Sequence, residues 1–257
     1  MAKKITFINE KGGVGKTSMA FNTAWELAMR KKKVLLIDFD GQRANLTFFT
    51  GLKRTEEMKT MFDVLVQNYP IKDAIQRVRK DFPLFIVPAN EVLTNLGSST
   101  KVSKLRKVLE EIADDFQYIF FDVNPSPDWR QALAMSVSDY LIIPMLPDIT
   151  SLEADIGITE SIREIQQTTN HNLRVLGIVF NKNTNRTNLS KEVKEIAEKT
   201  AKSLGSIVFK TKIRSLVALS ENVHAHVGIT EYDPASTASK DYKDFVKELE
   251  MEVKKNG

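Results

Sequence analysis

Residues 10–17 read Glu10-Lys11-Gly12-Gly13-Val14-Gly15-Lys16-Thr17, and this stretch decides the fold that we expect. An apolar segment at residues 5–9 precedes it, and a helical pattern begins near Thr17. A glycine-rich loop between a strand and a helix is typical of a phosphate-binding P-loop, in which backbone N–H groups point at phosphate oxygens. Lys16 would bridge the β- and γ-phosphates, and Thr17 would place its hydroxyl on Mg²⁺. We therefore predict a nucleoside triphosphate as the ligand.

The loop departs from the common motif at its start, because Glu10 stands where a glycine usually lies and Lys11 adds a second lysine. The string Lys-Gly-Gly-x-Gly-Lys-Thr resembles the deviant P-loop of the ParA/MinD family, whose relatives include the nitrogenase iron protein and arsenic-pump ATPases. The resemblance implies that Lys11 crosses a dimer interface and touches the nucleotide of its partner. A surface lysine beside an ordinary P-loop is the alternative.

The same resemblance assigns roles to the whole loop. The residues that would bind the nucleotide are Gly12, Gly13, Val14, Gly15, Lys16, Thr17 and Ser18. Lys11 and Lys16 would act in catalysis by neutralising phosphate charge, as an arginine finger does. ATP and Mg²⁺ are the implied cofactors.

Two apolar runs end in aspartates that fit such a site. One run precedes Asp38 and Asp40, and another precedes Asp122. Parallel strands bring their carboxyl ends to one edge of a sheet, so these acids are expected beside the P-loop. By resemblance to the family, Thr17 holds the metal, Asp38 and Asp122 support it through water, and Asp40 orients the attacking water. For Asp38 and Asp40, a helix cap is the alternative.

The composition favours one soluble domain over residues 1–257. Of the 257 residues, 42% are hydrophobic, and no linker-like stretch divides the chain. The chain has no cysteine, which excludes a thiolate-bound iron–sulfur cluster. We expect no helix-turn-helix domain before the P-loop, no secretion signal and no membrane span, and hence a cytoplasmic protein that the resemblance associates with the nucleoid.

Apolar runs alternate with helical periodicities along the chain. Strands are predicted near residues 4–9, 34–38, 84–87, 118–122, 139–143, 174–180 and 207–209, and helices near 17–30, 100–114, 151–169 and 189–203. Two short helices are predicted at residues 62–66 and 71–75. This alternation predicts an α/β fold of the P-loop NTPase class, with a mostly parallel, doubly wound sheet and helices on both faces.

The base can be argued from Asn181, which ends a predicted strand. The guanine-reading motif Asn-Lys-x-Asp needs an aspartate where this chain has Thr184, so adenine is favoured. By resemblance, Asn181 touches the adenine, and Tyr232 and Pro234 lie close to it. A plain turn rich in asparagine is the alternative.

The prediction of contacts to DNA rests on the resemblance more than on charge, since the net charge of the chain is only +4. In ParA-type partition ATPases, basic residues in the regions of Arg186, Lys210, Lys212 and Arg214 contact phosphates of nonspecific double-stranded DNA. Ala218 stands where family members commonly carry an arginine.

The reading we favour is a ParA-like ATPase for plasmid or chromosome partitioning. Its ATP-bound homodimer would bind nonspecific DNA, and hydrolysis stimulated by a ParB-like partner would release it. A MinD-like or other nucleotide-switched positioning ATPase, acting on a membrane or a protein scaffold, is the alternative. Against membrane binding, the last helix has one apolar face, residues 242–253, in an otherwise mixed-charge sequence, so we expect that face to pack on the protein's own core.

Overall fold

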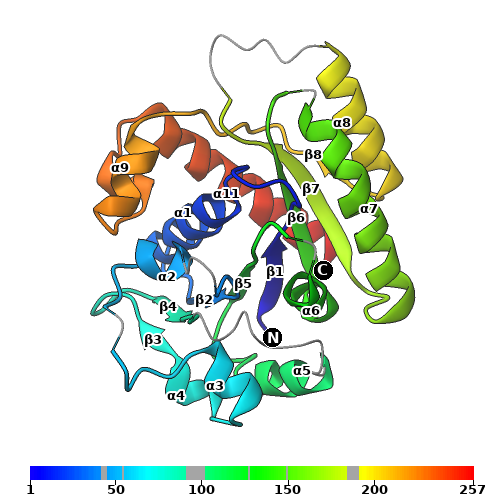
Figure 1. The fold of residues 1–257 in the computed structure, drawn as a ribbon. Coiled ribbons are helices and arrows are strands. Elements are labelled where there is room, and N and C mark those ends of the chain that lie inside the picture. Colours follow the sequence, from blue (N-terminus) through cyan, green and yellow to red (C-terminus); the bar gives the residue numbers. More distant parts are fainter. Residues whose placement is uncertain (42–44, 54, 91–101, 127, 149, 184–190) are drawn as a thin grey trace.

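The computed structural model describes residues 1–41, 45–53, 55–90, 102–126, 128–148, 150–183 and 191–257, with residues 150–156 described by their backbone only. Its centre is an eight-stranded sheet with the order β3-β4-β2-β5-β1-β6-β7-β8 (Figure 1). The strands are β1 (Lys3–Phe7), β2 (Val34–Asp38), β3 (Gln76–Arg77), β4 (Leu84–Val87), β5 (Tyr118–Asp122), β6 (Tyr140–Met145), β7 (Arg174–Phe180) and β8 (Ile207–Val208). All pairings are parallel except that of β3 with β4.

Helices cover both faces of this sheet, as expected (Figure 1). The helices described are α1 (Lys16–Met29), α2 (Asn45–Phe49), α3 (Met61–Val66), α4 (Ile71–Ala74), α5 (Val102–Glu110), α6 (Trp129–Val137), α7 (Thr150–Thr168), α8 (Lys191–Ser203), α9 (Ala218–His224), α10 (Ile229–Tyr232) and α11 (Thr237–Asn256). One face packs against α1 and α11. The other packs against α3 to α6 on one side of β1 and against α7 and α8 on the other.

The central strands are buried over their whole length because helices cover both of their faces. All five residues of β2 and all five of β5 are buried. Such a parallel strand is an apolar run, and Leu35 and Ile37 pack on one face while Val34 and Leu36 pack on the other. The ladder aligns Asp38 with Asp122. Both acids therefore come to the carboxyl edge, where the P-loop follows β1.

The C-terminal helix packs as predicted. On α11 the side chains of Tyr242, Phe245, Val246 and Leu249 are all buried in the core that α1 shares. Within the described residues, none of the helices is both long enough and apolar enough to span a lipid bilayer.

The predicted strands and long helices are confirmed, and the differences concern short elements. The elements that were not predicted are the antiparallel pair of β3 with β4 and the helices α2, α6, α9 and α10. Helix α6 begins after Asp128, whose carboxylate accepts a hydrogen bond from the Arg130 amide at 2.9 Å. Helix α5 ends at Glu110, earlier than the predicted boundary at 114.

Glycine at position 177 in β7 makes room for a buried aromatic ring. A Cβ there would lie 2.4 Å from Cε2 of Phe209, which is only 2% exposed. We expect Gly177→Ala to lower the free energy of unfolding by about 1–3 kcal/mol through overpacking, measured by urea denaturation. Phe209→Leu in the Gly177→Ala background should recover part of that loss. A Gly177→Ala protein as stable as the wild type would contradict this account of the packing.

Candidate functional site

Asn9 holds the start of the P-loop at the end of β1. Its Oδ1 accepts the Lys11 amide at 2.8 Å, and its Nδ2 donates to the carbonyl of Pro144 at 2.9 Å. Lys16 curls back over the loop, and its Nζ donates to the Asn9 carbonyl at 2.9 Å. The side chain of Lys16 is 6% exposed, and its burial lowers its pKa, against the attraction of Asp122 and Asp40. The ammonium group of Lys16 therefore already lies inside the site that the loop forms.

Asn181 closes the other side of the loop. Its Nδ2 donates to the carbonyl of Val14 at 2.7 Å. Gly15 has a φ of 92°, and a Cβ there would lie 2.2 Å from Nδ2 of Asn181. Glycine is therefore needed at position 15 for the backbone conformation and for the approach of Asn181.

Asp38 is fully buried and hydrogen-bonded by its own neighbourhood. Its Oδ1 accepts the Asp40 amide at 2.9 Å, while its Oδ2 accepts the Thr47 amide at 3.0 Å and the Thr47 hydroxyl at 2.6 Å. Burial raises the pKa of Asp38 to about 6, although the hydrogen bonds from Thr47 and Asp40 lower it. Asp38 thus fastens helix α2 to the end of β2.

Asp122 is buried as deeply but lacks such donors. Within the described part of the chain, neither carboxylate oxygen has a hydrogen-bond partner of good geometry. Burial and the neighbouring Asp38 raise its pKa well above the usual range, and the Thr17 hydroxyl and Lys16 only partly oppose this. A buried carboxylate without partners is costly in free energy, so Asp122 is a natural ligand for a cation.

A cavity of about 460 Å³ opens between these groups. Its described lining consists of Gly12, Gly13, Gly15, Lys16, Thr17, Ser18, Asp40, Asn45, Phe49, Val123, Pro125 and Lys182. Glycine backbone, a buried ammonium and hydroxyls on one wall suit phosphates. The carboxylate of Asp122 beside the Thr17 hydroxyl suits a hard cation that prefers oxygen ligands, such as Mg²⁺. The residues present therefore fit both expected cofactors.

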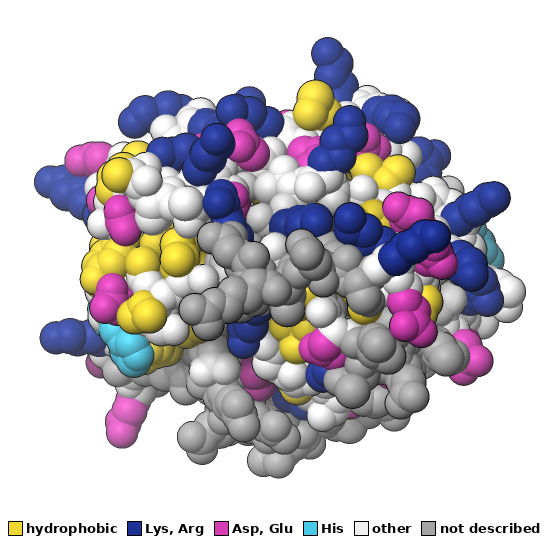
Figure 2. All heavy atoms as spheres, turned by 90° about the horizontal axis from the view of Figure 1, so that it is seen from above, with side chains coloured by type: hydrophobic (Ala, Val, Ile, Leu, Met, Phe, Trp, Pro, Cys, Tyr) yellow, Lys and Arg dark blue, Asp and Glu magenta, His cyan; other side chains and the backbone are white. Residues whose placement is uncertain are grey.

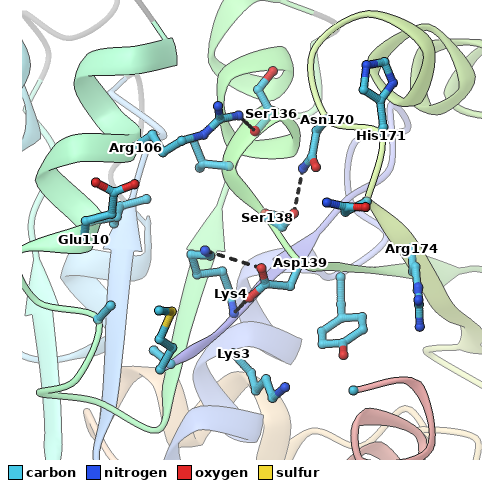
Figure 3. A pocket seen from close by; sticks show the side chains of 18 of the residues that line it. Lys3, Lys4, Arg106, Glu110, Ser136, Ser138, Asp139, Asn170, His171 and Arg174 are labelled. Atoms are coloured by element: carbon cyan, nitrogen blue, oxygen red, sulfur yellow. Dashed lines mark hydrogen bonds and ion pairs between the residues drawn. The ribbon is translucent and has the colours of Figure 1, made fainter.

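A larger cavity of about 760 Å³ lies at the opposite, amino-terminal edge of the sheet (Figure 3). The side chain of Lys4 there is paired with Asp139 at 3.3 Å, and Arg106 donates to the carbonyl of Ser136 at 3.3 Å. Its described lining contains no glycine-rich loop that could present successive N–H groups to phosphates. We therefore assign phosphate binding to the smaller cavity.

Two of the predicted adenine contacts stand apart from that cavity. Tyr232 lies on α10 and directs its hydroxyl to Glu221 at 3.4 Å, and the carbonyl of Pro234 accepts a hydrogen bond from Lys243 at 3.4 Å. Neither belongs to the described lining, whereas Asn181 touches the loop directly. Thr184 lies outside the described residues.

The residues predicted to contact DNA differ in their burial and in whether a carboxylate pairs with their charge. Lys210 is exposed, and Lys212 is half-buried with its pKa lowered by burial and by the nearby Lys194. Arg214 instead pairs with Asp241, with its Nε 2.8 Å from Oδ2. Arg186 lies outside the described residues. Figure 2 shows the face of the molecule at the carboxyl edge of the sheet, and Lys and Arg side chains lie along much of the border of that face.

Several residues that support the site were not predicted from the sequence. Thr47 binds Asp38, Asn9 binds the loop, and Asp148 lies 3.4 Å from the Nζ of Lys11. Asn9 had a usable signal, because it directly follows the strand and precedes the loop. Asp148 is distant from Lys11 in the sequence, and no motif marks the contact of Thr47 with Asp38.

Comparison with known proteins agrees with this geometry. Residues 2–175 match the protein family described as AAA domain. The chain is 30% identical to the sporulation initiation inhibitor protein Soj of Bacillus subtilis, over 97% of this chain and 98% of Soj. The chain belongs to the ParA/Soj/MinD family of partition ATPases.

Solved structures of other proteins share the fold of this ParA/Soj/MinD chain. Apo McdA of Cyanothece superposes with a TM-score of 0.86 at 20% identity, covering 97% of this chain and all of McdA. Cobyrinic acid a,c-diamide synthase of Mycobacterium smegmatis, with a bound ATP analogue and magnesium, superposes with a TM-score of 0.84 at 21% identity, over 100% and 97% of the two chains. At these identities the likeness shows a common fold.

Asp38 gives a pH dependence to the stability of the nucleotide-free protein. Its pKa is about 6 in the folded chain, against 3.8 for an ordinary aspartate. A carboxyl that holds its proton more tightly when folded favours folding at low pH, and this contribution is lost as the pH rises from about 4 to above 6. Asp38→Asn should therefore gain about 3 kcal/mol of stability relative to the wild type between pH 4 and pH 7, measured by urea denaturation.

Asp244→Asn is the matched control for that experiment, because this aspartate lies on the surface of α11. Its stability relative to the wild type should change little over the same range. If the relative stability of Asp38→Asn did not rise with pH, the burial of an ionisable Asp38 would be contradicted.

Proposed function

We propose that this protein is a Mg²⁺-requiring ATPase that partitions plasmid or chromosomal DNA. The ATP-bound homodimer binds nonspecific double-stranded DNA, and hydrolysis stimulated by a ParB-like partner releases it. The proposal includes a single domain over residues 1–257 and a nucleoid-associated place in the cytoplasm. The observation that carries the ATPase is the buried Asp122, whose oxygens have no hydrogen-bond partner of good geometry among the described residues, beside a P-loop whose Lys16 is already inside the site.

Each residue of the site has a task in phosphoryl transfer. Lys16 and the glycine amides of the loop hold the phosphates and offset their charge. Thr17 would hold Mg²⁺ directly and Asp122 would hold it through water, and the ion supplies further charge neutralisation at the phosphates. The bound ATP analogue and magnesium of the similarly folded cobyrinic acid a,c-diamide synthase support this pair of cofactors.

Asp40 is the residue that we assign to the attacking water. Its amide is fixed by Asp38 at 2.9 Å, and it lines the phosphate cavity. A carboxylate held at the cavity wall can orient a water molecule in line with the γ-phosphate, which is most of what this chemistry requires. Asp38 then acts through Asp40 and through α2. It thus links the part of the site that would hold the metal to Asp40, which would orient the water.

Lys11 supplies the argument for a dimer. In this chain its Nζ lies 3.4 Å from Asp148, and its side chain is 28% exposed. A partly exposed ion pair of this length is weak, so Lys11 can leave Asp148 when a nucleotide phosphate of a second copy approaches. The family resemblance gives Lys11 that role across the interface.

DNA binding is proposed for Lys210 and Lys212, with Arg186 as a further candidate. Neither Lys210 nor Lys212 forms an ion pair within the described residues, so each charge can meet a DNA phosphate. Arg214 is engaged by Asp241, and Asp241 raises the pKa of Arg214. Its contribution to DNA binding is therefore expected to be smaller.

Fluorescence anisotropy with random-sequence duplex DNA tests this function. With Mg²⁺ and ATP we expect binding that weakens steeply with salt, and with ADP or without nucleotide we expect none.

Lys210→Ala combined with Lys212→Ala should reduce the salt slope by about two and leave the melting temperature unchanged. Asp40→Ala should keep ATP-dependent DNA binding and lose turnover, which phosphate release measures.

Arg214→Ala is the contrasting variant. Since Arg214 bonds to Asp241, this change should lower the melting temperature more than it lowers DNA affinity. Absence of DNA binding in all three nucleotide states would refute the DNA part of the proposal and favour a relative that acts on a membrane or a protein scaffold.

A further inference from the structure

The first residues of the P-loop contact one stretch of the chain, which runs from the end of β6 into α7. Asn9 donates to the carbonyl of Pro144 at 2.9 Å, and Lys11 pairs with Asp148 at 3.4 Å. Glu10, which lies between them, reaches α7 itself. Three consecutive loop residues are thus held by one neighbouring segment.

Glu10 rests in a notch on the surface of α7. A Cβ at position 157 would lie 2.5 Å from Oε2 of Glu10, which is closer than two such atoms can approach. One turn further along the helix, the hydroxyl of Ser161 donates to Oε1 of Glu10 at 3.1 Å. Residues four apart lie on the same face of a helix, so Gly157 supplies the space and Ser161 supplies the hydrogen bond.

We propose that Gly157 and Ser161 form a seat for the Glu10 carboxylate and so position Lys11, the next residue. The inference rests on the proposed function for the role of Lys11 across a dimer interface. Glu10, Gly157 and Ser161 are positioning residues, since none of them belongs to the described lining of the phosphate cavity.

The pairing explains two unusual choices in the sequence. A glycine inside the 19-residue helix α7 is unfavourable compared with alanine, so its presence at position 157 calls for a reason in packing. A glutamate beside a phosphate site would repel its ligand unless its carboxylate is held elsewhere. The seat on α7 satisfies both conditions at once.

The seat also does what the pair of Lys11 with Asp148 cannot do alone. That ion pair is long and partly exposed, and pairs of this kind contribute little on their own. Glu10 instead fixes the backbone on the N-terminal side of Lys11, and Asn9 fixes the Lys11 amide. These two contacts hold the backbone at Lys11 in place when its ammonium group changes partner.

The test compares Gly157→Ala, Glu10→Ala and the double variant in the full chain. The new methyl group meets only the end of a flexible side chain, and alanine favours the helix, so Gly157→Ala should fold with an unchanged or higher melting temperature. Hydrogen exchange of residues 9–15 in the nucleotide-free protein should accelerate at least fivefold. Glu10→Ala should cause a similar acceleration, and the double variant should exchange no faster than Glu10→Ala alone.

The second readout is the dissociation constant of the dimer formed with Mg²⁺ and a non-hydrolysable ATP analogue, measured by analytical ultracentrifugation. It should rise about fivefold in Gly157→Ala, while the affinity for the nucleotide stays the same because Lys16 and the glycines are untouched. Glu160→Ala, at an exposed site on the same helix, is the matched control and should change neither readout.

Two results would overturn the seat: exchange of residues 9–15 that is unchanged in Gly157→Ala, or effects of Gly157→Ala and Glu10→Ala that simply add. If the wild type formed no ATP-dependent dimer, the proposed function would fail, yet the exchange measurement would still decide whether Glu10 is seated on α7.

Discussion

The burial of charge at the carboxyl ends of β1, β2 and β5 is the constraint on which the structure depends. Asp38 and Asp122 are aligned in adjacent strands, and both are fully buried. Burial raises the pKa of Asp122 well above its usual range, and the neighbouring Asp38 raises it further. Asp40 and Thr47 donate hydrogen bonds to Asp38, whereas among the described residues Asp122 has no donor of good geometry. The carboxylate without compensating hydrogen bonds therefore lies beside Thr17 and Lys16, which line the cavity.

The surrounding fold keeps this arrangement rigid. Helix α1 begins at the P-loop, and its buried face packs between the sheet and α11, so the loop is anchored by the largest core of the molecule. Helix α2 is fixed to β2 through Thr47, and α7 is fixed to the loop through Glu10. A nucleotide bound at the loop would therefore act on elements that are fixed to two surface helices. That arrangement suits a protein whose partners must sense which nucleotide is bound.

Much of this could be predicted from the sequence, because the informative signals are local. The P-loop, the aspartates after β2 and β5 and the alternation of strands and helices are patterns within short windows, and the structure confirms the sheet and its coverage. The short elements could not be predicted. β3 has only two residues, and α2 has five residues that are held by Asp38 from outside the helix. The contacts of Asp148 and Gly157 depend on pairings between distant segments, which no short window of sequence contains, and no motif marks the contact of Thr47 with Asp38. The pairing of Arg214 with Asp241 likewise became visible only in the fold.

The central claim is that the buried Asp122, whose oxygens have no hydrogen-bond partner of good geometry in the described part of the chain, completes a metal site with the nucleotide. Calorimetric titration of a non-hydrolysable ATP analogue, with Mg²⁺ and with EDTA, tests it most directly in the wild type and in Asp122→Asn. The account predicts that Mg²⁺ tightens nucleotide binding at least tenfold in the wild type, while Asp122→Asn binds the nucleotide with little gain from the metal. An equal gain from Mg²⁺ in both proteins would contradict it.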